Sequence, residues 1–315
     1  MKHGELLAIG GAYVDINVPN FPIGENGLQL ETETVGQGYE LVPGGSAVNF
    51  ARICSALGMP TTFVGKVGKD EMGIILSDML EQAEVEPLLV ISEDVSTNIS
   101  FNMVNDRGQT IMAVAGDANQ SLTADELIIR AQSRLEECHY LFIGGGFKLK
   151  SLLPTLEKLI LHAGTSNTSV VLDHGRLNNK VTAEERLLMK SLAKLSDYYL
   201  PSKDEFIELW EVASIEEGLN LLEHEVKGMI VVKDGENGVV SIVNGEIVRV
   251  PTITVKPIHT VGAGDSFDAG FITALSKGNE FIDSMRFGCI TAALKISQRS
   301  LPSYIDVANY IADHS

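Results

Sequence analysis

The most informative part of this sequence is the stretch His259-Thr260-Val261-Gly262-Ala263-Gly264-Asp265-Ser266-Phe267-Asp268-Ala269-Gly270-Phe271. Gly262, Ala263 and Gly264 can turn sharply and direct successive backbone N–H groups at one point. Apolar residues follow at helical spacing, so a helix is predicted over 265–277. Unpaired N–H groups and the positive end of a helix dipole then coincide, and such a place binds anions.

Asp265 directly follows this turn. A carboxylate beside a bound phosphate is electrostatically unfavourable, so we interpret Asp265 as a base that takes a proton from an attacking hydroxyl. The N–H groups of Ala263, Gly264 and Asp265 are predicted to hold the transferred phosphoryl group. This combination indicates phosphoryl transfer to an alcohol. The alternative is a plain strand-to-helix turn in which Asp265 caps the helix.

A second glycine-rich segment lies far upstream. It reads Pro43-Gly44-Gly45-Ser46-Ala47-Val48-Asn49-Phe50-Ala51 and is followed by Gly58 and Gly68. Gly44 and Gly45 allow the backbone to approach a ligand closely. Asn49, one turn into a predicted helix, offers an amide donor and acceptor suited to sugar hydroxyls.

Together, the two segments resemble the signatures of the ribokinase/phosphofructokinase-B family of carbohydrate and nucleoside kinases. Supporting matches run from Gly10-Gly11 to about Pro302, nearly the whole chain. The resemblance implies a ribokinase-like α/β fold and transfer of the γ-phosphoryl group of ATP, with Mg²⁺, to a primary hydroxyl of a small carbohydrate. Gly262, Ala263, Gly264 and Asp265 would be the catalytic residues. A nucleoside kinase acting on ribonucleosides is the alternative, and a non-catalytic ligand-binding regulator is a third possibility.

The resemblance also implies an acceptor site outside the glycine turn. Asp15 would accept hydrogen bonds from two sugar hydroxyls, and Gly44, Gly45 and Asn49 would complete the site. From its sequence context alone, Asp15 is also compatible with a cap or turn.

The nucleotide would contact a separate segment, 231–238. This segment resembles the family's strand and glycine turn beside the ATP phosphates, which implies that Lys233, Gly235 and Gly238 bind the cofactor together with Gly264. Without the resemblance, the segment could form a plain hairpin loop.

Two further segments match family motifs with one replacement each. In Pro201–Glu205, Ser202 stands where asparagine is usual in an Asn-x-x-Glu motif. Ser202 would bind the cofactor, and Glu205 would organise Mg²⁺ through water. In Asp173-His174-Gly175-Arg176, Gly175 replaces an asparagine. Arg176 would contact substrate or phosphate, or form a surface salt bridge.

Three positions depart from the family pattern. His259 replaces an aspartate that helps to hold a monovalent cation in many members, and Arg299-Ser300 replaces a Gly-Ala pair near the same site. Both changes predict weak or absent activation by monovalent cations. Cys289 takes an adenine-pocket position that is often asparagine, which weakens the expectation of strict ATP preference.

Composition limits the classes of partner. With 315 residues and 44% hydrophobic content, the chain can bury a large core. A formal net charge of −18 disfavours a nucleic-acid surface. The three cysteines are widely spaced, which predicts free thiols. The apolar run Leu6–Val14 is too short to span a membrane, so we expect a cytoplasmic protein without a membrane partner.

Short apolar runs alternate with helical patterns along the chain. This rhythm predicts a mainly parallel sheet with helices on both faces. Expected strands are 6–9, 61–67, 140–143, 170–173, 198–201 and 229–233, and expected helices are 47–57, 73–83, 154–163, 183–195 and 215–222. Ligands bind at the carboxyl ends of such strands. Asp15, Asp173, Lys233 and the glycine turn all follow strand candidates and are expected to share one crevice.

Two stretches, about 17–42 and 96–115, interrupt this rhythm. Residues 97–114 alternate like antiparallel strands around the turn 105–108. The resemblance implies that strands from both stretches form a small β lid over the sugar site, buried in a homodimer. We therefore expect a single domain over 1–315 with a lid that excludes water. An exposed hairpin without a gating role is the alternative.

Overall fold

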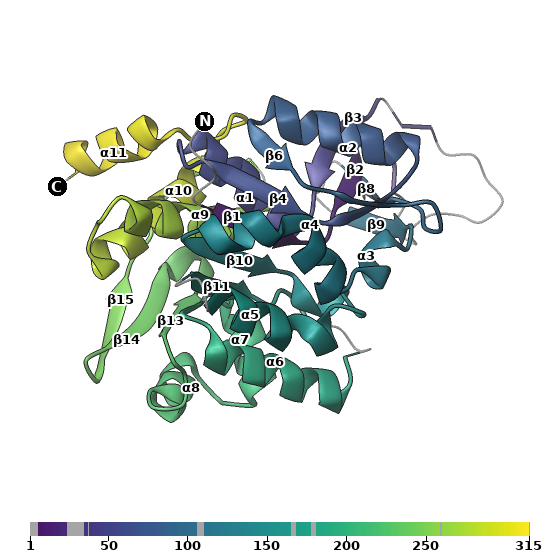
Figure 1. Ribbon diagram of the computed structural model, residues 1–315. Helices are drawn as coiled ribbons and strands as arrows, with labels where there is room; N and C mark the ends of the chain where they lie inside the picture. The colour runs from purple at the N-terminus through teal and green to yellow at the C-terminus, as the bar shows by residue number, and fades with distance from the viewer. Residues whose placement is uncertain are drawn as a thin grey trace.

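A nine-stranded sheet forms the centre of the computed structural model, which describes residues 6–23, 35–36, 38–105, 110–164, 168–177, 181–258 and 260–314 (Figure 1). Its order is β15-β14-β13-β12-β11-β10-β1-β4-β6. The strands from β13 to β6 are parallel, and β14 and β15 join antiparallel at one edge. The bounds are β1 Leu6–Gly10, β4 Thr61–Val64, β6 Val85–Pro87, β10 Tyr140–Gly144, β11 Ser169–Asp173, β12 Tyr198–Tyr199, β13 Met229–Lys233, β14 Val239–Val243 and β15 Glu246–Val250.

Helices cover both faces of this sheet, as the rhythm of the sequence predicts (Figure 1). Side chains of a strand alternate between the faces, so Leu7 and Ile9 enter one buried cluster and Leu6 and Ala8 enter the other. The first cluster includes α4 Ala124–Glu137, α5 Leu156–Gly164, α6 Ala183–Leu195, α7 Lys203–Trp210 and α8 Ile215–Leu222. The second includes α1 Ser46–Ala56, α2 Glu71–Gln82, α9 Ala263–Ser276, α10 Phe281–Ser297 and α11 Tyr304–Asp313. Shorter elements are α3 Ala118–Ser121 and the 3-10 turns η1 Gly146–Lys148, η2 Leu153–Thr155 and η3 Gly235–Asn237.

A separate four-stranded sheet, in the order β3-β2-β8-β9, lies at the opposite side of the molecule from α11 and β15 (Figure 1). Its strands are β2 Tyr13–Val18, β3 Glu40–Gly44, β8 Asn98–Val104 and β9 Thr110–Ala115. The antiparallel pairing of β8 with β9 agrees with the alternation expected over 97–114. Residues 106–109 of the expected turn lie outside the described residues. A third, two-stranded sheet joins β5 Lys66–Gly68 to β7 Val90–Ser92.

Asp15 lies inside β2, not after a strand as the sequence suggested. The first strand stops at Gly10 because the chain packs too closely there for a side chain. A Cβ atom on Gly10 would lie 2.5 Å from the Cβ atom of Ala47 in α1. The chain then crosses at Gly11 from the main sheet to the small one, which carries Asp15 with it.

Two further differences from the expected boundaries lie at glycines. The predicted strand over 61–67 divides at Gly65 into β4 and β5. Helix α9 begins at Ala263, two residues before the predicted start, because Gly262 adopts φ +78° and serves as the N-cap. Only glycine reaches that left-handed conformation without strain.

One face of the small sheet is polar along β2 and β8, and Met112 and Val114 of β9 lie on the same face. Asp15 and Asn17 share it with Ser100 and Asn102, their direct neighbours in the β2–β8 register. Asn102 Nδ2 donates to Asn17 Oδ1 at 3.0 Å, and Ser100 Oγ donates to Asn102 Oδ1 at 3.1 Å. Phe101 belongs to the opposite face.

Two expectations from composition can be compared with the structure. Cys54, Cys138 and Cys289 are free and buried, as their spacing predicts. Within the described ranges, none of the helices combines the length and the apolar character needed to cross a bilayer.

Candidate active site

The glycine turn stands at the start of α9. Gly262 caps the helix through its backbone, and no side chain caps this end. The alternative in which Asp265 is the N-cap is therefore wrong. Ala263 N–H donates to Thr260 O at 3.3 Å, whereas the amides of Gly264 and Asp265 have no acceptor among the described residues. An anion at this turn would meet two free donors at the positive end of a helix.

The carboxylate of Asp265 points toward α1. Ser46 Oγ donates to Oδ1 at 2.6 Å, and Asn49 Nδ2 donates to Oδ2 at 3.0 Å. Loss of hydration raises the pKa of Asp265 to about 6, although the Ser46 hydrogen bond works in the other direction. Asn49, expected in the acceptor site, thus orients the candidate base.

Ser46 was assigned no role from the sequence. Its position could have indicated one, because Ser46 and Asn49 are three residues apart and so share one face of a helix.

Close packing near Asp15 leaves no room for a side chain at Gly44 or at Gly45. A Cβ atom on Gly44 would lie 2.2 Å from the carboxyl carbon of Asp15, and one on Gly45 would lie 2.2 Å from the carbonyl oxygen of Gly11. Gly45 also adopts φ +108° as the N-cap of α1. These contacts bring the predicted acceptor residues together at the start of α1, the helix whose Ser46 and Asn49 hydrogen-bond to Asp265.

Asp15 is half-buried on the polar face of the small sheet. Burial raises its pKa to about 6, and the positive charge of Lys148 works against this rise. Lys148 ends η1, just beyond β10, and is exposed. Lys148 had no predicted role, although it follows a strand of the parallel sheet.

Lys233 ends β13, but its ammonium group contacts two carboxyl groups, those of Asp173 and Asp268. The same Nζ atom lies 3.4 Å from the place that a Cβ atom on Gly264 would take. The structure thus brings Asp173, Lys233 and the glycine turn together, as their positions after strands predicted. Asp268 had no predicted role.

Gly235 is the first residue of η3, and Gly238 follows its last residue. Gly238 has φ +89°, and a Cβ atom there would lie 2.1 Å from Val250 O in β15. The neighbouring strand therefore accounts for Gly238. Gly235 has φ +58° and open space around its missing Cβ atom, so a ligand can approach its backbone.

Glu205 lies in the first turn of α7. Its Oε2 atom accepts a hydrogen bond from Ser202 N at 2.9 Å. The described part of the chain contains no cluster of three side chains able to ligate a metal. The role of Glu205 toward Mg²⁺ stays a prediction. Arg176, at the same edge of the sheet, is exposed.

The departures from the family pattern have different surroundings. Cys289 is buried in α10, where burial raises its pKa to about 12. Arg299 and Ser300 are exposed beyond the end of α10. His259 lies outside the described residues.

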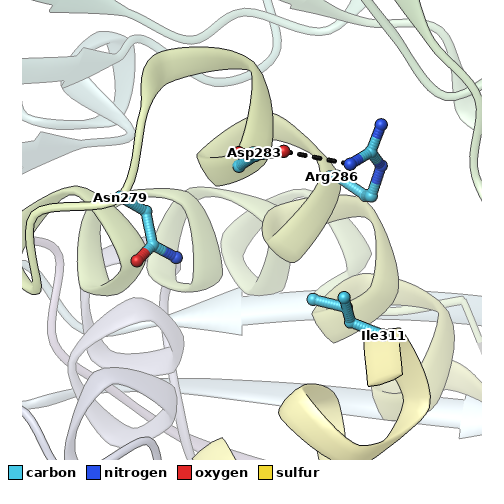
Figure 2. Close-up of a pocket in the computed structure, with 4 residues that line it drawn as sticks. All are labelled: Asn279, Asp283, Arg286 and Ile311. Atoms are coloured by element: carbon cyan, nitrogen blue, oxygen red, sulfur yellow. Dashed lines mark hydrogen bonds and ion pairs between the residues drawn. The ribbon is translucent and has the colours of Figure 1, made fainter. Parts of the chain in front are cut away.

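A surface hollow of about 370 Å³ lies apart from this site (Figure 2). Asn279, Asp283, Arg286 and Ile311 line it, and Asp283 pairs with Arg286 at 3.0 Å. Asn279 follows the C-terminal end of α9, whereas the glycine turn is at the N-terminal end. A helix of 14 residues is roughly 21 Å long, so the hollow and the glycine turn lie at opposite ends of α9.

Comparisons with known proteins agree with this arrangement. The family model for pfkB family carbohydrate kinases matches residues 7–305. The chain is 24% identical to 5-dehydro-2-deoxygluconokinase of Bacillus subtilis, over 98% of this chain and 95% of that protein. It is 23% identical to ribokinase of Haemophilus influenzae, over 86% of each chain. An E. coli protein described as ribokinase II, solved with ATP and Mg²⁺, superposes with a TM-score of 0.84 at 20% identity, over 99% of this chain and 100% of that one. The chain belongs to the pfkB family of carbohydrate kinases.

Proposed function

We propose that this protein is an ATP-dependent sugar kinase that phosphorylates a primary hydroxyl of a small carbohydrate, with Asp265 as the general base. One observation carries the proposal. The carboxylate of Asp265 is held by Ser46 and Asn49 directly beside the free amides of the first turn of α9. A base for the attacking hydroxyl and a binding place for the transferred group are thus adjacent.

Each part of the turn has a separate task in the reaction. Asp265 takes the hydroxyl proton as the acceptor oxygen attacks the phosphorus. The Gly264 and Asp265 amides hold the phosphoryl oxygens, and as fixed donors they need little rearrangement in the transition state. Ser46 and Asn49 keep the carboxylate aimed at the acceptor.

ATP supplies the phosphoryl group, and Mg²⁺ offsets the charge of the phosphates. The similar E. coli protein holds both ligands. In this chain Glu205 would bind the ion through water, Gly235 and Gly264 would approach the phosphates with their backbones, and Ser202 would contribute its hydroxyl group.

The acceptor would lie between Asp15 and Asp265, below the polar face of the small sheet. Asp15 accepts hydrogen bonds from two hydroxyls. Lys148 is the one cation whose charge acts on Asp15 among the described residues. Keto-sugar acids are therefore included among the acceptors to be tried, since the charge of Lys148 would offset part of the repulsion between two carboxylates.

The direct test is ADP release from MgATP with pentoses, hexoses, keto-sugar acids and nucleosides, each with and without potassium. Acceptor-dependent release supports the kinase and defines its substrate class, and release with nucleosides alone favours a nucleoside kinase. Ligand-induced thermal stabilisation without ADP release would instead support a binding protein. Because we expect weak or absent activation by monovalent cations, the rate of ADP release should be about the same with and without potassium.

The pH dependence tests both carboxylates together. Asp15 and Asp265 each have a pKa of about 6 in the free protein, and each acts in its ionised form. The plot of log(kcat/KM) against pH is therefore expected to be level above about pH 7 and to fall with a slope approaching about 2 below pH 6. In Asp15→Asn the slope should drop to about 1. A wild-type profile that stays level down to pH 5 contradicts both assignments.

A homodimer through the small sheet is part of the proposal. Strand β9 is an edge of this sheet, and its Met112 and Val114 are 66% and 55% exposed. An exposed apolar edge strand is a surface for pairing with another chain. The double variant Met112→Lys/Val114→Lys is expected to sediment as a monomer, whereas Leu187→Lys, an exposed position on α6, should leave the dimer intact. A wild-type monomer at micromolar concentration would end this part of the proposal.

A further inference from the structure

Three ionisable side chains meet inside the protein beside the glycine turn. Lys233 Nζ lies 2.9 Å from Asp173 Oδ2, and 3.0 and 3.1 Å from the two carboxyl oxygens of Asp268. Lys233 is 9% exposed, Asp173 5% and Asp268 0%. Water cannot replace these buried contacts, so the charged form of each side chain is stabilised by its contacts within the cluster.

The buried charges of the cluster act on one another. Burial raises the pKa of Asp268 well above its usual range, and Asp268 shares a hydrogen bond with Asp173. Burial also acts to raise the pKa of Asp173, but the charge of Lys233 and the hydrogen bonds to Asp268 and Lys233 together lower it. For Lys233, burial opposes the charged form, but the nearby carboxyl groups of Asp173, Asp268 and Glu205 together raise the pKa. Lys233 and Asp173 thus form a buried ion pair, and burial disfavours a second negative charge on Asp268.

The three residues join separate parts of the site. Asp173 ends β11 and Lys233 ends β13, and the two strands are separated in the sheet by β12. Asp268 lies on α9, one turn beyond Gly264 and Asp265. The ammonium group also packs against the first turn, 3.4 Å from the missing Cβ position of Gly264. The cluster therefore links two strand ends to the helix that carries the base and the free amides.

We propose that Lys233, Asp173 and Asp268 are positioning residues that hold the first two turns of α9 against the strand ends, and that Lys233 is not a ligand of the nucleotide. The inference rests on the proposed function of Asp265. An ammonium group has three donors, and here two buried carboxyl groups already engage it. Moving it to a phosphate would leave an anion unpaired in the interior, which is strongly unfavourable.

The first test separates positioning from nucleotide binding. In Lys233→Met the kcat is expected to fall by about 10–100-fold, because small displacements of reacting groups have effects of this size. The Kd for MgADP, measured by calorimetry, should stay within about threefold of wild type, because the substitution removes no contact with the bound nucleotide. A weaker Kd with an unchanged kcat would show that Lys233 is a nucleotide ligand. Lys277→Met, at the opposite end of α9, is the matched control and should keep both values.

A second variant guards against simple loss of folding. Lys233→Met leaves the buried Asp173 carboxylate without its cation, whereas Lys233→Met/Asp173→Asn removes both members of the ion pair. The double variant should therefore melt at a higher temperature than the single one, yet retain a lowered kcat. If the kcat recovers together with the melting temperature, the cluster only stabilises the fold and the proposal is wrong.

The pH profile of kcat/KM provides a further test. If the three residues only stabilised the fold, these substitutions would not shift the profile in the pattern described next. The charges that act on Asp265 are those of Asp173, which raises its pKa, and Lys233, which lowers it, and Asp173 has the greater effect. The acid limb of kcat/KM should move to higher pH in Lys233→Met and below the wild-type position in the double variant. Equal movement in both variants contradicts the proposal. If the wild-type protein releases no ADP with any acceptor, the proposed function fails instead, and MgADP calorimetry still tests whether Lys233 binds the nucleotide.

Discussion

Replacing Asp265 with asparagine is expected to lower kcat by about 10²–10⁴-fold, the usual contribution of a general base. The amide has the shape of the carboxylate, and its oxygen can still accept the hydrogen bond from Ser46. It cannot take the acceptor proton. Because the backbone amides of α9 are unchanged, the Kd values for MgADP and for the acceptor should stay close to wild type. Turnover is followed by ADP release at saturating substrates, and binding by calorimetry.

A matched control comes from the far end of the helical layer. Asp283→Asn removes the same charge from an exposed position on α10, in the hollow shown in Figure 2, and should leave kcat unchanged. If Asp265→Asn keeps wild-type turnover, Asp265 is not the base. If Asp283→Asn alone is inactive, the site has been placed at the wrong end of α9.

Asp15→Ala is expected to lower kcat/KM for the acceptor by at least about 10²-fold. Two hydrogen bonds from hydroxyls to a carboxylate contribute about 1.5–3 kcal/mol each, which corresponds to about 10²–10⁴ in this ratio. The effect should be confined to the acceptor, since Asp15 lies on β2 of the small sheet, whereas Gly235 follows β13 of the main sheet. The KM for MgATP should therefore change little.

The control for this prediction is Asp94→Ala, which removes an exposed aspartate in the loop before β8. It should leave acceptor kinetics unchanged. Wild-type acceptor kinetics in Asp15→Ala would exclude Asp15 from the site, and an equal rise in the KM for MgATP would indicate a general distortion.

Local patterns were enough to predict the parallel strands β1, β4, β10, β11, β12 and β13, but not β6, β14 and β15. Strands and helices follow from hydrophobic periodicity, and parallel strands bring their carboxyl ends to one edge whatever the details of packing. The position of Asp15 was not predictable in this way. It depends on the close approach of Gly10 to Ala47, a contact between segments that sequence periodicity does not relate.

The supporting residues of the site were missed for the same reason. Ser46 and Asp265 are 219 residues apart in the chain, and only the folded structure shows that their side chains meet. Asp268 did carry a signal. It lies within the run 266–274, all buried in α9, and a carboxyl group in such a helix requires a partner. The identity of that partner, Lys233, again depends on the sheet order.

The polar face of the small sheet has a consequence for how this enzyme can change. Asn17, Ser100 and Asn102 lie on strands that supply neither the base nor the free amides, and among the described residues their side chains hydrogen-bond to one another. Variation at these three positions can therefore alter which sugars fit without moving the residues that perform the transfer. A combinatorial library limited to positions 17, 100 and 102 should therefore be enough to change the acceptor preference. Such a library leaves the sequence of the catalytic turn unchanged.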